Sequence, residues 1–428
     1  MRRFLSLSLA LALVYSISLP VRAELLKNVK LDGSIETRSF GIDNETDRNG
    51  TADDYRSETN VRVMVGTNFD LLDDVHARLL VDRSPRMGTA AGTVTTVQDT
   101  LTLDNAYVKI DKVFGSVDLT IGRQFLGPSD SDLNVFFGPN GDDLLTVASV
   151  DSFRADTTIG NGLLRICGVA GQLASVASPA RNANQVAGGP LTYYGGEIGS
   201  EKLVPHAYAG LYYYTMQTHI QKSAAAVGNN TLTATGLRVQ GGLLPGLGYH
   251  AEYIQNFGRA NATAGTPAYH GNAAFLGLKY GTEVAKLPVR AQLEVGRGSD
   301  DFLAINPAKR FGLIWGEHST YGPSALNRNQ ANGLCNLKVA DIGVGVNPLA
   351  KLGVDVNAYR FMYDAGTVAN NGKTSAGTEY DLILSWKHSD NVSFEVNAAT
   401  FQVGDALQNA GTATSPITRL GSDVKIKF

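Results

Sequence analysis

Charged side chains recur at every second position in many segments of this chain, with apolar side chains between them. Residues 377–388 show the pattern, with Glu379, Asp381 and Lys387 alternating with Tyr380, Leu382, Leu384 and Trp386. In an extended chain, alternate residues point to opposite sides, so the charged groups share one surface. Burying unpaired charge is costly, so this surface is predicted either to face water, where it attracts ions and polar solutes, or to hold paired charges.

The same alternation assigns charged residues from the whole chain to one polar interior. The residues expected to line it are Arg38, Arg62, Arg78, Lys109, Arg123, Arg154, Arg238, Lys279, Arg290, Glu294, Glu379, Asp381 and Lys387. Arg123 follows the apolar Ile121 by two positions, so its place in this set requires a β-bulge. Acidic residues accompany the bases at nearly every segment. Rings of one sign select ions of the other, whereas a mixed wall indicates a hydrophilic pore with local pairs, or charges that only pair across neighbouring strands.

Residues that could support catalysis or bind a metal do not form a recognisable motif. The seven histidines are scattered, without the HExxH spacing of a zinc site, and neither a GxSxG elbow nor a P-loop occurs. Cys167 and Cys335 lack metal-ligand spacing and are interpreted as two unrelated thiols. We therefore predict no catalytic residue, metal or cofactor. A Ser–His pair assembled in space remains an alternative, because sequence spacing does not reveal such sites.

The N-terminus has the pattern of a secretion signal. Arg2 and Arg3 precede an apolar stretch, which ends at the small-residue pattern Val21-Arg22-Ala23. This predicts a signal peptide over residues 1–23; a short membrane anchor is the alternative, although the run is shorter than the roughly 20 residues needed to span. The chain has a formal net charge of −3, and an acidic chain is not expected to bind nucleic acid.

The elements that must position the charged residues are predicted to be β-strands of about ten residues, the length of a tilted transmembrane strand. Short turns near 71–74, 160–162, 244–246, 347–350 and 389–391 alternate with long polar loops. This rhythm is typical of an outer-membrane barrel with short periplasmic turns and long extracellular loops. We predict that residues 24–428 form one all-β, antiparallel up-and-down transmembrane barrel of about 18 strands. A soluble sandwich or propeller is the alternative.

Two long loops carry separate hypotheses. The acidic loop 39–57 contains Asp43, Glu45, Asp47, Asp53 and Asp54, which would either bind Ca²⁺ or form a solvated surface. The longest loop, 299–335, carries Phe302, Phe311, Trp315 and Tyr321. Long loops without structure of their own are often functional. This aromatic segment is expected either to fold inward and narrow the pore, or to pack over the external rim.

The last eight residues, GSDVKIKF, form an amphipathic segment. Val424, Ile426 and Phe428 alternate with Lys425 and Lys427, which predicts a final strand whose apolar side faces lipid. An unpaired strand edge is not tolerated in lipid, so this strand is expected to close against the first. The segment also resembles the C-terminal signal that the barrel-assembly machinery recognises, with Val424, Ile426 and Phe428 as its apolar positions.

Three blocks resemble the alginate-export family of outer-membrane barrels. They are the segment with Gly122, Arg123 and Gln124, the late aromatic loop FGLIWGE, and the hairpin that opens with Gly377, Glu379 and Asp381. The resemblance covers most of the mature chain and implies a monomeric eighteen-stranded barrel. It also implies passage of a polyanionic polysaccharide through a lumen rich in Arg and Lys.

Two hypotheses for function follow from these patterns. The first is an outer-membrane channel, similar to a porin, through which hydrophilic solutes diffuse. The second is an exporter of an anionic exopolysaccharide such as alginate. In both, the expected partners are outer-membrane lipid and lipopolysaccharide, the barrel-assembly machinery, and the solute or polysaccharide. A barrel that serves as a scaffold or enzyme is a third, more distant reading.

Overall fold

The computed structural model describes residues 26–45, 55–83, 101–125, 149–173, 191–218, 230–259, 269–304, 309, 311–316, 334–366, 372–408 and 415–428. Within them, β-strands account for nearly all regular structure, and no helix is long and apolar enough to cross a membrane. The strands are β1 (Lys27–Asp43), β2 (Arg56–Leu72), β3 (Val75–Arg83), β4 (Leu101–Val113), β5 (Val117–Gln124), β6 (Val150–Ile159), β7 (Leu164–Leu173), β8 (Leu191–Val204), β9 (Ala207–Thr218), β10 (Asn230–Leu244), β11 (Leu247–Arg259), β12 (Asn272–Val284), β13 (Leu287–Gly298), β14 (Leu337–Leu349), β15 (Leu352–Tyr363), β16 (Ser375–Lys387), β17 (Val392–Val403) and β18 (Ile417–Lys427).

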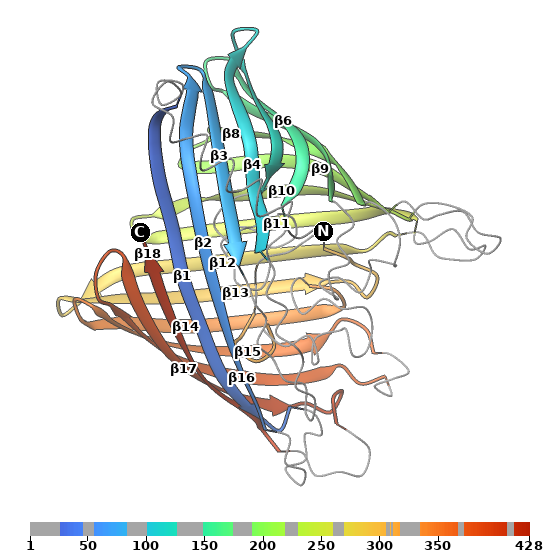
Figure 1. Cartoon of the computed structure of the whole chain (residues 1–428). Coiled ribbons are helices and arrows are strands. Elements are labelled where there is room, and N and C mark those ends of the chain that lie inside the picture. Colours follow the sequence, from blue (N-terminus) through green and yellow to red (C-terminus); the bar gives the residue numbers. More distant parts are fainter. Residues whose placement is uncertain are drawn as a thin grey trace, which may run out of the picture.

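These strands form one closed sheet. Each strand pairs antiparallel with its neighbours in sequence, and β1 pairs with both β2 and β18. The strands therefore run up and down around a single barrel (Figure 1). The prediction of an all-β, antiparallel barrel of about 18 strands is confirmed, with 18 strands in the sheet. The soluble sandwich and propeller are excluded.

The seam between the first and last strands is regular. Ile35 lies opposite Ile426, and Gly33 and Phe428 exchange two backbone hydrogen bonds of 2.9 and 3.0 Å. A Cβ atom on Gly33 would overlap the Phe428 ring, so the glycine leaves room for the terminal aromatic side chain. The C-terminal residue is therefore part of the ladder, and the barrel has no open edge at this point.

Connections differ in length at the two ends of the barrel. Every second connection, from β2–β3 to β16–β17, is a turn of two to four residues. The strand ends that the long connections join lie at the opposite end (Figure 1). We refer to these two ends as the turn end and the loop end. The predicted alternation of short turns and long loops is confirmed.

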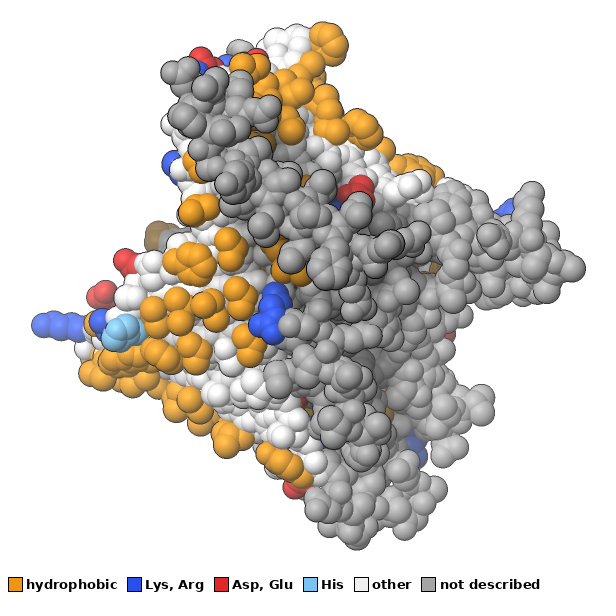
Figure 2. All heavy atoms as spheres, viewed as in Figure 1, with side chains coloured by type: hydrophobic (Ala, Val, Ile, Leu, Met, Phe, Trp, Pro, Cys, Tyr) orange, Lys and Arg blue, Asp and Glu red, His pale blue; other side chains and the backbone are white. Residues whose placement is uncertain are grey.

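The two faces of the wall differ in chemistry. Large apolar side chains on the outer face are widely exposed, as Phe153, Ile342 and Leu420 show at 61%, 60% and 64%. Figure 2 shows such side chains as a band over the outside of the strands. Their neighbours on each strand point inward and are mostly buried. In β9, Tyr212 and Tyr214 face the interior.

Candidate functional site: a sealed wall and an open cavity in the barrel interior

Most of the charged residues assigned to the interior do point inward. Along each strand they share the side of buried neighbours, and the following lie on the inner face: Arg38, Arg62, Arg78, Lys109, Arg154, Arg238, Lys279, Arg290, Glu294, Glu379 and Asp381. Lys387 keeps the inward parity but lies at the turn end. Its amine pairs with Asp390 at 2.8 Å, and both side chains are largely exposed. Lys387 is therefore a rim residue.

Arg123 is the exception, and its assignment to the interior is wrong. The pairing of β5 with β6 runs without a shift from Val117 to Gln124, so the bulge that an inward Arg123 requires is absent there. Arg123 instead shares the side of Ile121 and forms two 2.8 Å hydrogen bonds to Asp151. Asp151 lies on the same side of β6 as the exposed Phe153. Arg123 and Asp151 thus form an ion pair on the outer face, near the loop end.

Inward-facing bases are matched by acids of the wall itself. Seven of the predicted bases have such a partner: Arg38 with Asp423, Arg62 with Asp82, Arg78 with Asp32, Lys109 with Asp111, Arg154 with Asp156, Arg238 with Glu197, and Arg290 with Asp355. Most of these pairs join different strands. At these pairs the wall therefore carries both signs in close contact.

Part of the connection between β13 and β14 packs inside the barrel. In residues 311–316, the side chains of Phe311, Ile314 and Trp315 are fully buried. The Trp315 ring stacks on Phe361 of β15 with centroids 4.6 Å apart, and on Phe401 of β17 at 5.8 Å. Both partners point inward from the wall. Of the two positions expected for this aromatic segment, the structure shows the inward one; Tyr321 lies outside the described residues.

Two carboxylates of β16 hold this segment by its backbone. Glu379 accepts hydrogen bonds from the N–H groups of Ile314 and Trp315 at 2.6 and 3.0 Å, and Asp381 accepts one from Leu313 at 3.1 Å. Glu379 is completely buried. A buried carboxylate needs such donors, because its charge is otherwise left without solvation. These two residues thus support the inward segment.

Gly312 allows the segment to approach Glu379. Its φ of +79° lies in the left-handed region, which glycine adopts without the steric penalty of a Cβ atom. A Cβ atom at this position would also lie within 2.7 Å of the Glu379 carboxylate. The glycine therefore satisfies two requirements at once, the backbone turn and the close contact.

A buried ion pair anchors the same connection to β13. The Lys309 amine lies 2.9 Å from Glu294, and each side chain is about 5% exposed. The amine also lies 5.4 and 5.5 Å from the ring centroids of Phe275 and Phe311, within the range of cation–π attraction. Lys309 lies in a loop, outside any alternating pattern, so its role could not be inferred from the sequence.

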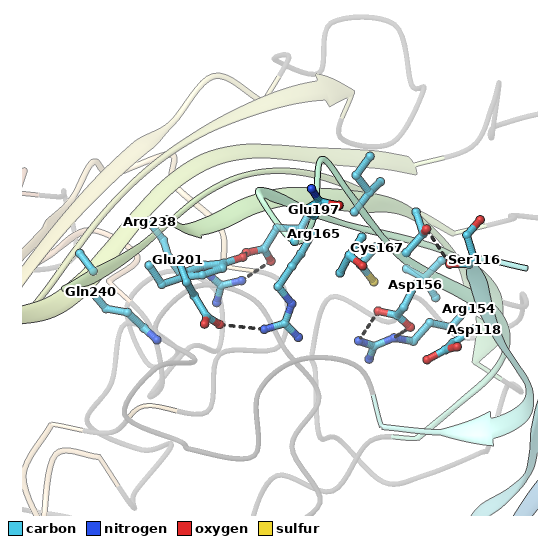
Figure 3. Close-up of a pocket in the computed structure, with 18 of the residues that line it drawn as sticks. Ser116, Asp118, Arg154, Asp156, Arg165, Cys167, Glu197, Glu201, Arg238 and Gln240 are labelled. Atoms are coloured by element: carbon cyan, nitrogen blue, oxygen red, sulfur yellow. Dashed lines mark hydrogen bonds and ion pairs between the residues drawn. The ribbon is translucent and has the colours of Figure 1, made fainter. Parts of the chain in front are cut away.

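The opposite part of the interior is open. A cavity of about 1440 Å³ lies against the turn-end halves of β6 to β10, where charged and aromatic side chains line it (Figure 3). Arg154 and Asp156, Arg165 and Glu201, and Arg238 and Glu197 form three ion pairs along its wall. Tyr208 donates its hydroxyl to Glu197. The cavity therefore offers donors and acceptors of both charges to polar solutes.

The remaining candidates for chemistry are not assembled by the described residues. No group of three or more His, Cys, Asp or Glu side chains there could hold a metal ion. In the acidic loop, Glu45 pairs with Arg56 at 2.8 Å, whereas Asp47, Asp53 and Asp54 lie outside the description. Cys167 lines the cavity, Cys335 is buried near the start of β14, and no disulfide joins them.

Comparison with known proteins places this barrel in a family. A family described as alginate export matches residues 190–419, and no curated protein matches. Among solved structures, OccK8 (OprE) of Pseudomonas aeruginosa is similar with a TM-score of 0.59 and 14% identity over 94% of this chain and 99% of that one. The outer membrane protein OprD of P. aeruginosa is similar with a TM-score of 0.58 and 12% identity, over 94% of this chain and 94% of that one. OccAB1 of Acinetobacter baumannii is similar with a TM-score of 0.57 and 13% identity, over 94% of this chain and 98% of that one. The family match extends over more than half of the sequence, and the chain belongs to the alginate-export family.

Proposed function

We propose that the protein is a channel of the bacterial outer membrane through which hydrophilic solutes diffuse. The observation that carries this proposal is the pairing of seven inward bases with wall acids, which leaves a polar interior in which these bases are neutralised locally. Such a wall can interact with polar solutes of either sign, whereas strong selection for one sign needs a ring of the other. The similar barrel structures support the channel architecture.

The inward segment sets the width of the proposed channel. Residues 311–316 occupy the space beside β15 to β17 that an empty barrel would leave to water. Solutes would therefore pass beside this segment and through the cavity at the turn-end halves of β6 to β10. We infer a narrowed pore for small solutes, with Arg154, Arg238 and their acidic partners along its wall.

Export of an anionic polysaccharide is the second candidate, and the family match favours it. A polyuronate carries one carboxylate per sugar, so its passage would be helped by bases that are not already neutralised. In this interior, Arg154 Nε lies 2.7 Å from Asp156 Oδ2, and Arg78 Nη2 lies 2.8 Å from Asp32 Oδ2, so both guanidinium groups are already paired with a carboxylate. This pairing favours the channel for small solutes over the polymer exporter.

Planar-bilayer recording of the purified full-length protein tests the two candidates. We expect stable single-channel currents, a small reversal potential in a KCl gradient, and no block by polyuronate. Strong anion selectivity together with block by the polymer would instead establish the exporter. Absence of any current from correctly folded protein would overturn both candidates.

The proposal extends to how the chain reaches the membrane. Residues 1–23, which lie outside the described part of the structure, would direct secretion and be removed, and residues 24–428 would form the barrel. The apolar positions Val424, Ile426 and Phe428 of the closing strand would be recognised by the barrel-assembly machinery. The protein would act as a monomer without enzymatic activity. Mass spectrometry of the mature N-terminus tests the cleavage site after Ala23.

A further inference from the structure

Three basic side chains lie on the outer face of the barrel at its loop end. These are Arg297 of β13, Lys338 of β14 and Arg360 of β15, on neighbouring strands. The residues before and after each of them are buried in the interior, which shows that the three side chains point outward. Arg297 lies opposite Lys338, and Arg360 lies opposite Ala340, two residues further along β14. The three cations therefore form one patch.

Only one acidic side chain among the described contacts of this patch balances it. Asp364 accepts from Arg297 at 2.6 Å and lies 3.0 Å from the Lys338 amine. Burial alone would raise the pKa of Asp364, but the hydrogen bonds and charges of Arg297 and Lys338 bring it below its ordinary value. Arg360 instead donates to two neutral hydroxyls, Thr378 Oγ1 at 2.8 Å and Ser375 Oγ at 2.7 Å. The patch thus keeps an excess of positive charge.

The position of this excess charge matters. On the same strands, the outward residues nearer the middle of the wall are apolar and exposed, namely Leu293, Val295, Ile342, Val344 and Val356. Figure 2 shows Lys and Arg side chains at the border between such an apolar band and the loop end. If the apolar band lies in the lipid core, this border lies at the level of the lipid headgroups.

A second outward arginine at the loop end provides a comparison. Arg123 makes two hydrogen bonds of 2.8 Å to Asp151, so one carboxylate neutralises one guanidinium. At β13 to β15, three cations share one carboxylate. Both sites lie on the outer face near the loop ends of their strands but differ in their net charge.

We propose that Arg297, Lys338 and Arg360 bind the phosphorylated headgroup of an anionic lipid in the leaflet at the loop end of the barrel. Guanidinium groups bind phosphate oxygens through paired N–H donors, and the lysine adds a compact charge. Anionic headgroups are attracted to basic residues at the membrane surface. This inference rests on the membrane location of the barrel, which is part of the proposed function, but not on what passes through its pore.

Native mass spectrometry of the full-length protein in detergent tests the site, with lipopolysaccharide and its enzymatically dephosphorylated form as probes. We expect the wild type to retain the phosphorylated lipid. The variant R297Q/K338Q/R360Q should bind it roughly 100-fold more weakly, because each base lost should reduce the affinity for an anionic headgroup about fivefold. The single variant R360Q should lose part of this affinity, whereas R123Q, at the neutral pair, should keep all of it.

Two outcomes would overturn the site. One is equal binding by the triple variant and the wild type; the other is equal binding of the phosphorylated and dephosphorylated lipids. Variants are compared only when heat-modified gel mobility shows a folded barrel, and R360Q serves if the triple variant does not fold. Bilayer currents are recorded in parallel. Lipid binding without currents would reject the channel and keep the site, and currents without phosphate-dependent binding would do the reverse.

Discussion

Two regions of the interior use the same strand geometry for opposite purposes. Along β15 to β17, inward Phe361 and Phe401 pack against Trp315, and Glu379 is buried under backbone N–H donors. Along β6 to β10, inward Arg154 and Asp156 pair beside a cavity of about 1440 Å³. The first wall holds a segment of the chain, and the second lines an open cavity with ion pairs of its own.

The two walls differ in which groups donate hydrogen bonds to their carboxylates. Glu379 and Asp381 receive hydrogen bonds from a loop, so they stabilise the wall only while the loop remains in place. Asp156 and Glu197 are satisfied by arginines of the wall, so they need no loop. Changes in the first wall should therefore alter the width of the pore, and changes in the second should alter only its preference for charge.

The largest effect is expected from Glu379→Ala. This change removes the acceptor of two backbone hydrogen bonds, each worth roughly 0.5–1.5 kcal/mol, so the segment 311–316 should no longer pack against β15 to β17. Single-channel conductance in planar bilayers should rise. Glu395→Ala is the matched control, because Glu395 also points inward but bonds to Asn397 of its own strand. Equal conductance of the two variants would show that Glu379 does not hold a constriction.

Gly312→Ala should displace residues 311–316 from β15 to β17 without changing a charge. Alanine in the left-handed region costs roughly 1–2 kcal/mol, and its Cβ atom would also overlap the Glu379 carboxylate. Gly372→Ala is the control, since Gly372 has a similar φ of +74° and open space around its Cα atom. In a Trp386→Phe background, Trp315 emission should shift to the red for Gly312→Ala alone. A blue emission maximum in both variants would contradict the steric argument.

The buried pair of Lys309 and Glu294 should behave as a unit. Removing one partner of a buried ion pair costs roughly 3–5 kcal/mol, whereas replacing both with apolar residues is often neutral. Lys309→Met should therefore increase current fluctuations between open levels, and Lys309→Met/Glu294→Met should restore steady currents. If the double variant fluctuates as much as the single one, the pair does not anchor the loop.

The fold could be predicted from the sequence to a large extent, because strand alternation and loop rhythm are local signals. The pairing of the last strand with the first followed from a different argument, the cost of an unpaired strand edge in lipid. Arg123 shows the limit of a motif, since its resemblance to a family segment suggested an inward position while its parity with Ile121 indicated the outward one that the structure shows. The packing site of Trp315 could not be predicted from the sequence. Its partners, Phe361 and Phe401, lie on later strands, and contacts between residues far apart in the chain depend on how their side chains fit together.

In the open wall, the effects should concern charge and not width. Glu197→Gln removes the acid that forms an ion pair with Arg238 and should favour anions, and Arg238→Gln should favour cations, with conductance nearly unchanged. The effect should be small, because a single charge acting through water contributes about 1 kcal/mol at 4 Å. Reversal potentials in a KCl gradient measure it, with the outward Arg123→Gln as control. Shifts of the same sign in both variants would show that this pair does not face the path of ions.

The smallest effect is expected at Cys167, which lines the cavity beside Asp156. A cationic methanethiosulfonate added to the wild type should attach slowly to this half-buried thiol and lower the conductance slightly, because the new group occupies a small part of a wide cavity. Cys335 is only 1% exposed, so Cys335→Ser should respond as the wild type does. Cys167→Ser should be insensitive. A response that persists in Cys167→Ser would show that Cys335, beside the wall that packs against residues 311–316, is the reactive thiol. The two walls would then not differ in their access to water.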